Sequence, residues 1–284
     1  MMKKVIKMAR SASKAGLLVM SIALLVSVSM VKAAPFGELQ SFWDDRENDS
    51  TMTVDHSVWQ SILDEYLDDE TEDGVNRFNY DGITEEGRNQ LSSYLEYLQS
   101  VEPRQLNSNE QMAYWINLYN AATVFVVLDQ GDGLTSIREI RSGIFTPGPW
   151  KLKLLKVVYQ DLSLDDIEHG ILRPIWRDKR IHYAVNCASI GCPNLLKTAF
   201  TKDNLEELLE QAAKDYINHP RGVNIEDEEL ILSSIFDWYA EDFGDGFSDL
   251  LQHLLDYSEP EQASQIKDFT DADYDYDWDF NGVN

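Results

Sequence analysis

Hydrophobic side chains recur every three or four residues over most of the chain, the spacing that places them on one face of a helix. This pattern predicts amphipathic helices at 54–67, 84–100, 204–218, 234–243 and 247–257. A further helix begins at Ser163, whose hydroxyl can cap it, and Asp165 and Asp166 in its first turn suit the helix dipole. Pro174 is expected to end or kink that helix.

Strands are predicted between the helices, either from β-rich composition or from alternation of apolar and polar residues. They lie at 75–80, 150–159 and 181–187, with a hairpin at 223–232. From residue 274 to residue 281 aromatic side chains alternate with polar ones, mostly acids, which predicts a strand pressed onto the core. The expected fold is α+β, with a single domain over 54–284 whose helices pack on a small, mostly antiparallel sheet.

The helix predicted at 110–128 is apolar nearly all round and is therefore expected to be central and buried. It contains Asn117 and Asn120, which are three residues apart and so share one face. A buried amide without partners costs on the order of 1–3 kcal/mol. Either both asparagines brace a neighbouring loop, or one of them orients a catalytic side chain.

The first residues have the features of a secretory signal. Five basic residues precede an apolar run at 15–31, and small residues then allow cleavage after Ala33. The sequence thus predicts a signal peptide at 1–33, a flexible lead-in at 34–53, and a periplasmic or secreted location. The alternative is an uncleaved anchor, because the apolar run is just long enough to span a membrane. No later segment is apolar and long enough to span a membrane, so we do not expect an integral membrane protein after cleavage.

The charge of the chain argues against some partners. It has 24 Lys and Arg against 50 Asp and Glu, and six of the basic residues but no acid lie in the first 34 residues. The part after the signal therefore carries a net charge of about −32. Such a surplus repels a phosphate backbone, so nucleic acid is not an expected partner. The substrate and the oligomeric state are not indicated.

Reactive side chains gather in one region. The chain has two cysteines, Cys187 and Cys192, which lie in the segment HYAVNCASIGCPNL after His182, and Glu168 and His169 stand a little upstream. One interpretation is nucleophilic catalysis, in which an imidazole makes the Cys187 thiolate and the thiolate attacks an acyl carbon.

The base would be His169 or His182. If 182–187 is a regular strand, His182 and Cys187 point to opposite faces, which favours His169. Glu168, Asn117 or Asn120 would then orient the imidazole, although adjacent residues such as Glu168 and His169 diverge by about 100° on a helix.

Cys192 is an alternative candidate for the reactive thiol. Pro193 suits the first position of a helix, which would place the Cys192 thiol at a helix N-terminus, where a thiolate is favoured.

Two other interpretations remain open. In an oxidising compartment, Cys187 and Cys192 would by default form a disulfide, a structural staple in a non-catalytic binding or scaffold domain. A metal site could also draw on these thiols with His169, His182 and Glu168, but the paired spacings typical of zinc sites are missing. We therefore expect no metal and no cofactor. The remaining histidines, His56, His219 and His253, have polar neighbours and are expected at the surface.

Five segments resemble the family known as domain of unknown function 547. They are AYWINLYNA at 113–121, SLDDIEHGILR at 163–173, RIHYAVNCASIGCP at 180–193, LSSIFDWYAEDF at 232–243 and YDWDFN at 276–281. The resemblance implies a secreted or periplasmic protein whose Cys, His and Asn content is similar to that of papain-like thiol enzymes. Plant relatives look as if they carry serine at position 192, which implies that Cys187 is the functional thiol and that no disulfide is required.

The order of the residues qualifies the likeness to papain. His169 precedes Cys187 here, the reverse of the papain order, so a thiol enzyme would need a permuted arrangement. The function expected from the residues and the resemblance together is that of a thiol hydrolase or acyltransferase acting on an amide or ester.

Overall fold

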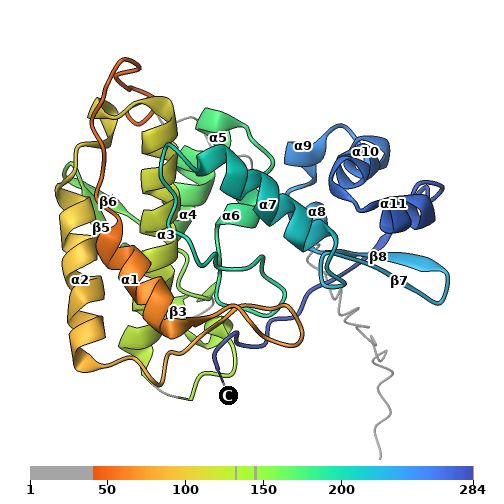
Figure 1. Cartoon of the computed structure of the whole chain (residues 1–284), viewed down its shortest axis with the longest axis horizontal. Helices are drawn as coiled ribbons and strands as arrows, with labels where there is room; N and C mark the ends of the chain where they lie inside the picture. The colour runs from red at the N-terminus through yellow and green to blue at the C-terminus, as the bar shows by residue number, and fades with distance from the viewer. Residues whose placement is uncertain (1–40, 132, 144–145, 284) are drawn as a thin grey trace, which may run out of the picture. The chain divides into compact units, whose positions relative to one another are not determined.

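The computed structural model describes residues 41–131, 133–143 and 146–283 (Figure 1). The signal peptide predicted at 1–33 and the first part of the lead-in predicted at 34–53 lie outside the described residues. None of the helices in these ranges is long and apolar enough to cross a membrane.

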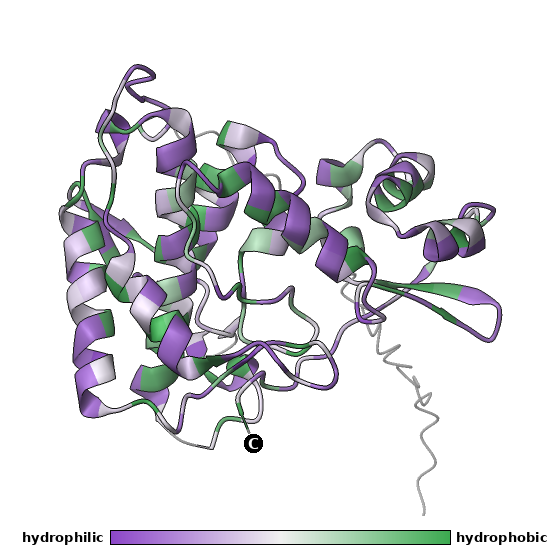
Figure 2. Ribbon diagram, viewed as in Figure 1, coloured by the Kyte–Doolittle hydropathy of each residue, from purple (hydrophilic) through white to green (hydrophobic). Residues whose placement is uncertain are grey.

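Helix α3 (Ser108–Gln130) is the central element, as expected for 110–128. Asn107 caps it by accepting a hydrogen bond from the Glu110 N–H, and Gly131, at φ +84°, ends it. Nearly every side chain from Glu110 to Leu128 is buried. Helix α2 (Glu85–Ser100) packs on α3, and α1 (Ser57–Tyr66) packs on α2. In Figure 2, α1 and α2 carry both hydrophilic and hydrophobic residues, as expected of helices that cover a core.

The segment that follows Ser163 combines three kinds of turn. Helix α4 (Leu164–Ile167) begins with a capping box, in which Ser163 Oγ accepts from the Asp166 N–H and the Asp166 carboxylate accepts from the Ser163 N–H. A wider π-helical turn, η3 (Glu168–Leu172), leads into α5 (Arg173–Trp176). Pro174 therefore does not end the helix there: it lies in the first turn of α5, where its missing N–H costs nothing.

The strands are short and mostly antiparallel, which confirms the α+β class, but within the described residues they form four small sheets rather than one. Three sheets are pairs, and in the fourth β8 pairs with β7 on one side and in parallel with β9 on the other. The pairs are β1 (Leu67–Asp68) with β2 (Arg77–Phe78), β3 (Arg141–Gly143) with β4 (Thr146–Pro147), and β5 (Leu155–Val157) with β6 (Gln160–Leu162). The fourth sheet contains β7 (Val223–Glu226), β8 (Glu229–Ser233) and β9 (Asp273–Asp275).

The remaining helices follow the predicted pattern with some breaks. They are the short turns η1 (Pro103–Gln105) and η2 (Ile137–Glu139), and the helices α6 (Ile181–Ala184), α7 (Leu205–Ile217), α8 (Ile235–Trp238), α9 (Ala240–Phe243), α10 (Phe247–Tyr257) and α11 (Pro260–Ile266). Helix α11 is not predicted by the sequence, because Ile266 is its only buried side chain and no apolar stripe marks it.

The strand predicted at 181–187 is wrong. Residues Ile181–Ala184 form helix α6, and the chain becomes extended only from Val185. Asp178 starts the turn, because its carboxylate accepts from the Arg180 N–H and its carbonyl oxygen accepts from the Ile181 N–H. A short apolar run such as this one has no periodicity that separates a buried helical turn from a strand.

The strand predicted over 274–281 is also only partly right. The regular strand is confined to β9, whose three residues are all exposed, and further along Phe280 forms an isolated antiparallel bridge with Ser189. Beyond β9 the chain runs extended, and Tyr276, Trp278 and Phe280 are half-buried against other aromatic side chains.

Two hydrophobic clusters form the core. The larger one surrounds α3, and the smaller one joins α7, α10, α11 and the hairpin of β7 and β8. Helix α6 stands between them, because Tyr183 belongs to the smaller cluster whereas Ala184 belongs to the larger. Packing against both clusters therefore fixes the position of α6, and with it the start of the chain segment that follows.

The lead-in predicted at 34–53 is held more closely than expected from residue 41 onward. The Trp43 ring is 1% exposed and meets the Trp115 ring edge-on at 5.0 Å. Glu47 adds a backbone hydrogen bond to the Leu106 carbonyl. Gln111 also donates to the Trp43 and Asp45 carbonyl oxygens, so the buried tryptophan and backbone hydrogen bonds together dock a polar segment whose composition predicts a loop.

Two histidines expected at the surface are buried. His56 Nδ1 lies 2.6 Å from the Tyr94 hydroxyl and His253 Nε2 lies 2.9 Å from the Tyr183 hydroxyl. Burial lowers the pKa of each imidazole to about 4. His219 is half-buried, and its Nε2 donates to the Asp73 carbonyl. The expectation of surface histidines is therefore wrong for His56 and His253.

These two imidazoles should make the protein sensitive to acid. In the unfolded chain a histidine titrates near about 6.5, so between there and about pH 4 the unfolded state binds protons that His56 and His253 in the folded state do not. The free energy of unfolding should be fully present above pH 6.5 and fall by up to about 3 kcal/mol per histidine as the pH drops to 4. Urea unfolding across this range measures the slope.

A variant with His56→Gln and His253→Gln keeps the acidic residues of the protein unchanged. We expect its stability to depend less steeply on pH between 6.5 and 4 than that of the wild type. Equal slopes in the two proteins would contradict the assignment of the acid sensitivity to the buried imidazoles.

Candidate functional site

Asn120 on α3 fixes the start of the turn that carries both cysteines. Its amide donates to the Ala184 carbonyl oxygen and accepts from the Asn186 N–H, both at 2.9 Å. Asn186 continues the bracing, because its side chain accepts from the Ala188 N–H and donates to the Pro193 carbonyl oxygen. The chain from 184 to 193 is thus held by two buried amides in series.

Asn117 does the same for a different loop. Its Nδ2 donates to the Phe200 carbonyl oxygen at 2.7 Å and its Oδ1 accepts from the Phe200 N–H at 3.1 Å. Of the two alternatives for the asparagines, the contacts therefore match the bracing of neighbouring loops. Neither amide has a hydrogen bond to His169 or His182 among the described residues.

The turn itself is strained and tightly enclosed. Ala188, directly after Cys187, has φ +59°, a conformation that costs a residue with a side chain about 1–2 kcal/mol. Gly191 lies so close to the incoming C-terminal segment that a Cβ there would come within 2.8 Å of the Asp277 backbone. On the other side, the Tyr216 hydroxyl donates to the Gly191 carbonyl oxygen at 2.7 Å. The enclosure on several sides maintains the strained conformation.

The Cys187 sulfur is half-buried between two hydroxyl groups. Its Sγ lies 3.2 Å from Ser189 Oγ and 3.2 Å from the Tyr276 hydroxyl, and these two oxygens are 3.0 Å apart. A hydrogen bond from the Cys192 thiol, together with those from Ser189 and Tyr276, lowers the pKa of the Cys187 thiol, although burial and the charge of Glu168 oppose this. The surroundings therefore favour the thiolate.

Cys192 is buried beside Cys187, and both thiols are free. Its Sγ accepts a hydrogen bond from the Cys187 N–H at 2.9 Å and lies 3.8 Å from the Val185 carbonyl oxygen. Burial raises the pKa of the Cys192 thiol well above its ordinary value. The predicted helix N-terminus at Pro193 is wrong, because residues 193–200 contain no helix, so no helix dipole acts on this thiol.

Aromatic rings from the C-terminal segment flank Cys187. Tyr276 packs on Trp238 at 4.8 Å and on Trp278 at 4.6 Å between ring centroids. Its side chain belongs to a segment about ninety residues after Cys187. The sequence shows Tyr276 only as one of a row of aromatic residues, so its contact with the sulfur is not predictable from spacing.

His182 lies in a buried cluster next to the cysteine turn. Its Nε2 donates to the Asp242 carboxylate at 2.7 Å, and its ring stacks on Tyr239 at 4.4 Å. Burial lowers the pKa of His182 although Asp242 and Glu168 act in the opposite direction. In the neutral ring that donates from Nε2, the lone pair lies on Nδ1.

Arg173 links the other members of this cluster. Its guanidinium is almost completely buried, donates to the Asp242 carboxylate at 2.6 Å and lies 4.7 Å from the Tyr239 ring centre. A second nitrogen donates to His169 Nδ1 at 3.1 Å. Burial raises the pKa of Asp242, but hydrogen bonds from His182 and Arg173 outweigh it and hold that pKa below its ordinary value.

Glu168 connects this cluster to Cys187. The Tyr119 hydroxyl donates to Glu168 Oε2 at 3.1 Å, and Glu168 Oε1 lies 3.8 Å from His169 Nδ1. The charge of Glu168 raises the pKa of Cys187 and, after burial, that of Tyr239. Glu168 therefore lies within electrostatic range of the sulfur without touching it.

The predicted site residues thus fall into three groups. Cys187 lies at the turn, His182, His169 and Glu168 lie in the adjacent cluster, and Asn117 and Asn120 brace loops. Among the described residues no hydrogen bond joins Cys187 to either histidine. The argument that placed His182 and Cys187 on opposite faces of a strand fails, because α6 is helical.

Several residues of the site escape prediction from the sequence. They are Ser189, Tyr276, Tyr119, Tyr239, Arg173 and Asp242. Arg173 and Asp242 lie inside segments 163–173 and 232–243, which carry the family resemblance. The family resemblance is thus the feature of the sequence that points to these two residues. Neither segment alone shows that the side chains of Arg173 and Asp242 pair across 69 residues.

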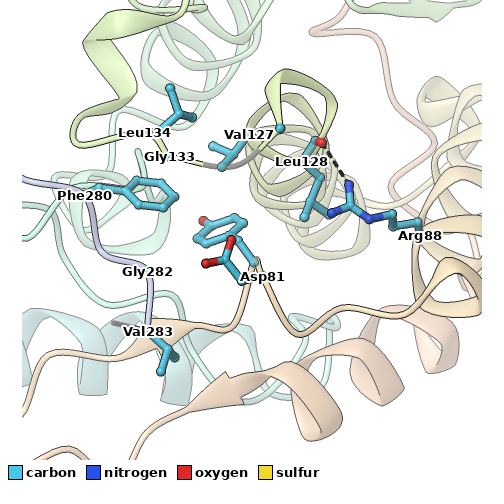
Figure 3. A pocket seen from close by; sticks show the side chains of 11 residues that line it. Asp81, Arg88, Val127, Leu128, Gly133, Leu134, Phe280, Gly282 and Val283 are labelled. Carbon is cyan, nitrogen blue, oxygen red and sulfur yellow. Dashed lines mark hydrogen bonds between the residues drawn. The ribbon is translucent and has the colours of Figure 1, made fainter.

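A separate pocket of about 160 Å³ opens between α3 and the C-terminal segment. Figure 3 shows Asp81 between Phe280 and Arg88, and the Arg88 guanidinium donates to the Leu128 carbonyl oxygen at 2.9 Å. Tyr80 also lines this pocket, and burial raises its pKa, with the two cysteines contributing. Tyr80 thus stands within electrostatic range of the cysteine turn. No group of three or more His, Cys, Asp or Glu in the described ranges is arranged to hold a metal ion.

Comparison with known proteins finds one family model that matches this region. Residues 103–217 match the family described as "Protein of unknown function, DUF547". The match covers α3, the π-helical turn and the cysteine turn, and it confirms the suspected family for the segments at 113–121, 163–173 and 180–193. The segments at 232–243 and 276–281 lie outside the matched residues. No curated protein and no solved structure matches the chain.

The Asn120 amide should be a large contributor to stability. Replacing Asn120 with Ala removes one acceptor and one donor and leaves the Asn186 N–H and the Ala184 carbonyl oxygen buried without partners. At roughly 1–3 kcal/mol for each unpaired group, we expect the free energy of unfolding to fall by about 2–5 kcal/mol. Denaturant unfolding measures the change.

Asn89 provides the matched control, since it is an exposed asparagine on α2. Asn89→Ala should change the stability by no more than about 0.5 kcal/mol. A loss in Asn120→Ala as small as that of Asn89→Ala would show that the turn does not depend on the amide.

Proposed function

We propose that this protein is a thiol hydrolase or acyltransferase that acts on an amide or ester, with Cys187 as its nucleophile. The single observation that supports the proposal is the setting of the Cys187 sulfur. It is half-buried, lies 3.2 Å from each of two hydroxyl groups, and has a pKa below the ordinary value for a thiol. Thiolate character of this kind is what a cysteine needs to attack an acyl carbon.

The hydroxyl groups have a definite task in this reaction. Ser189 and Tyr276 carry one hydroxyl hydrogen each. Two hydroxyl hydrogens are therefore available for the three contacts among the Cys187 sulfur and these two hydroxyl groups. When Cys187 is a thiol, its own hydrogen completes the set, and when it is a thiolate both hydroxyl hydrogens can point to the sulfur. The thiolate then forms a bond to the carbonyl carbon, the bond to the leaving group breaks, and water cleaves the resulting thioester.

We assign His182 as the general base for that water. Asp242 holds its Nε2–H, so the tautomer is fixed and Nδ1 carries the lone pair. The lowered pKa of His182 keeps the ring neutral near pH 7, as a base requires. His169 is less suited, because the Arg173 guanidinium donates to its Nδ1. The orienting group is then Asp242, in place of Glu168, Asn117 or Asn120.

The proposed location is the periplasm or the outside of the cell. It is supported by the basic residues, the apolar run and the cleavage motif at 1–33.

A second candidate function is a non-catalytic binding domain. The observation that favours it is the pairing in the buried cluster of Arg173, Asp242, His182 and Glu168, where most polar atoms have a partner, as in a structural network. In that case the acids at the surface would recognise a cationic partner, and Cys187 would not react with acyl donors.

Acylation by p-nitrophenyl acetate tests the catalytic proposal. The wild type should release p-nitrophenolate in a burst and gain one acetyl group on Cys187, as measured by intact mass and peptide mapping. Cys187→Ala should lose both signals and keep its melting temperature within a few degrees. Absence of the adduct in the wild type, together with a large loss of stability in Cys187→Ala, would favour the binding domain.

The two histidines can be separated by the same assay. His182→Ala should slow hydrolysis of the acetyl enzyme by roughly 10²–10⁴-fold, so that the adduct accumulates, because no base activates the water. His169→Ala is the matched control and should change the hydrolysis rate much less. A larger effect in His169→Ala would move the base to that residue.

A further inference from the structure

Two free thiols in one buried turn suggest a chemistry that the acyl-transfer proposal does not use. Cys192 Sγ accepts from the Cys187 N–H at 2.9 Å, which holds its sulfur beside Cys187. Acyl transfer at Cys187 requires no second cysteine. The pair also differs in access, since Cys187 is half-buried whereas Cys192 is 4% exposed. An external reagent therefore meets Cys187 first.

We infer that Cys187 and Cys192 are a redox-active pair in which Cys192 resolves a mixed disulfide formed at Cys187. The external reactant is a small disulfide of the glutathione class. The inference goes beyond the proposed function and shares with it only the thiolate at Cys187.

The exchange balances in two steps. The Cys187 thiolate attacks one sulfur of the small disulfide, so that a mixed disulfide forms and one small thiolate leaves. Cys192 then gives its proton to that thiolate or to water, and its sulfur attacks the Cys187 sulfur. The Cys187–Cys192 bond forms and the second small thiolate leaves. The pair is oxidised by two electrons, and the small disulfide is reduced to two thiols.

The order of attack follows from the surroundings of each sulfur. Hydrogen bonds from Cys192, Ser189 and Tyr276 lower the pKa of Cys187, whereas burial raises that of Cys192. A thiol that ionises more readily and belongs to the more exposed residue, paired with a buried thiol that is protonated, is the usual division between an attacking and a resolving cysteine.

The fold keeps the two sulfurs together during the exchange. Asn186 accepts from the Ala188 N–H and donates to the Pro193 carbonyl oxygen, so one side chain ties the two ends of the turn. The Cys192 N–H donates to the Ser189 carbonyl oxygen at 3.1 Å inside it. A mixed disulfide at Cys187 is therefore formed next to a thiol that has little freedom to move away.

The oxidised state would leave no hydroxyl group stranded. When Cys187 bonds to Cys192, Ser189 and Tyr276 lose the sulfur as a partner but keep their own contact at 3.0 Å. Because a buried polar group without a partner costs about 1–3 kcal/mol, this contact removes an obstacle to oxidation. The disulfide would switch off the proposed nucleophile, and reduction would restore it.

Equilibration of the folded protein with mixtures of reduced and oxidised glutathione tests the inference. After acid quenching and alkylation, intact mass should show the wild type in two forms, either with two alkylated thiols or with an internal disulfide that has lost two hydrogen atoms. The glutathione adduct should be scarce in the wild type. In Cys192→Ser it should accumulate on Cys187 to at least about tenfold the wild-type level, because nothing resolves it.

Cys187→Ser is the matched control, and its buried Cys192 should take up no glutathione. If Cys192→Ser fails to fold, Cys192→Ala provides the same comparison. The inference is overturned if the wild type keeps two free thiols in fully oxidised glutathione, or if it holds as much glutathione adduct as Cys192→Ser. A wild type that forms the internal disulfide but is not acetylated by p-nitrophenyl acetate overturns only the proposed function. An acetylated protein that forms no internal disulfide overturns only this inference.

Discussion

The pairing of two amides inside an apolar helix is the constraint on which the site depends. Asn117 and Asn120 lie on one face of α3, where water cannot satisfy them, and each finds its partners in the backbone of a loop. An asparagine amide left unpaired at this position would cost free energy. The backbone of residues 184–186 and of residue 200 must therefore lie within hydrogen-bond distance of these two side chains. The loops carry few regular hydrogen bonds of their own, so the central helix supplies the order that a large sheet provides in other α+β domains.

The same principle explains why the polar cluster stands next to the cysteine turn. Arg173 is almost fully buried, and a buried guanidinium requires anionic partners. Asp242 supplies one and, by also accepting from His182, fixes the tautomer of that imidazole. The π-helical turn aligns Glu168 with this group from the opposite side. One buried cation thus contacts Asp242 and His169 directly and reaches His182 through Asp242, and of this cluster Glu168 acts electrostatically on the Cys187 sulfur.

The sequence was informative where a pattern extends over several turns and uninformative where contacts are remote. The helices α2, α3, α7 and α10 follow from apolar spacing, and so does the buried character of Asn117 and Asn120. The run from Ile181 to Ala184 is too short to carry a period, which is why its helical turn was predicted as a strand. For the site, the cysteines and histidines were found by residue type. Tyr276 and Asp242 were not, because tertiary packing alone brings them to Cys187 and His182.

The contact between Tyr276 and the Cys187 sulfur has a consequence for the order in which the protein matures. Synthesis delivers the chain from its N-terminus, so the cysteine turn is available before the segment that contains Tyr276. Until that segment docks beside Gly191, the thiol lacks one of the hydroxyl groups that favour its ionised form. The hydrogen bond from Tyr276, and its share in lowering the pKa of Cys187, therefore arise only after the C-terminal segment has docked.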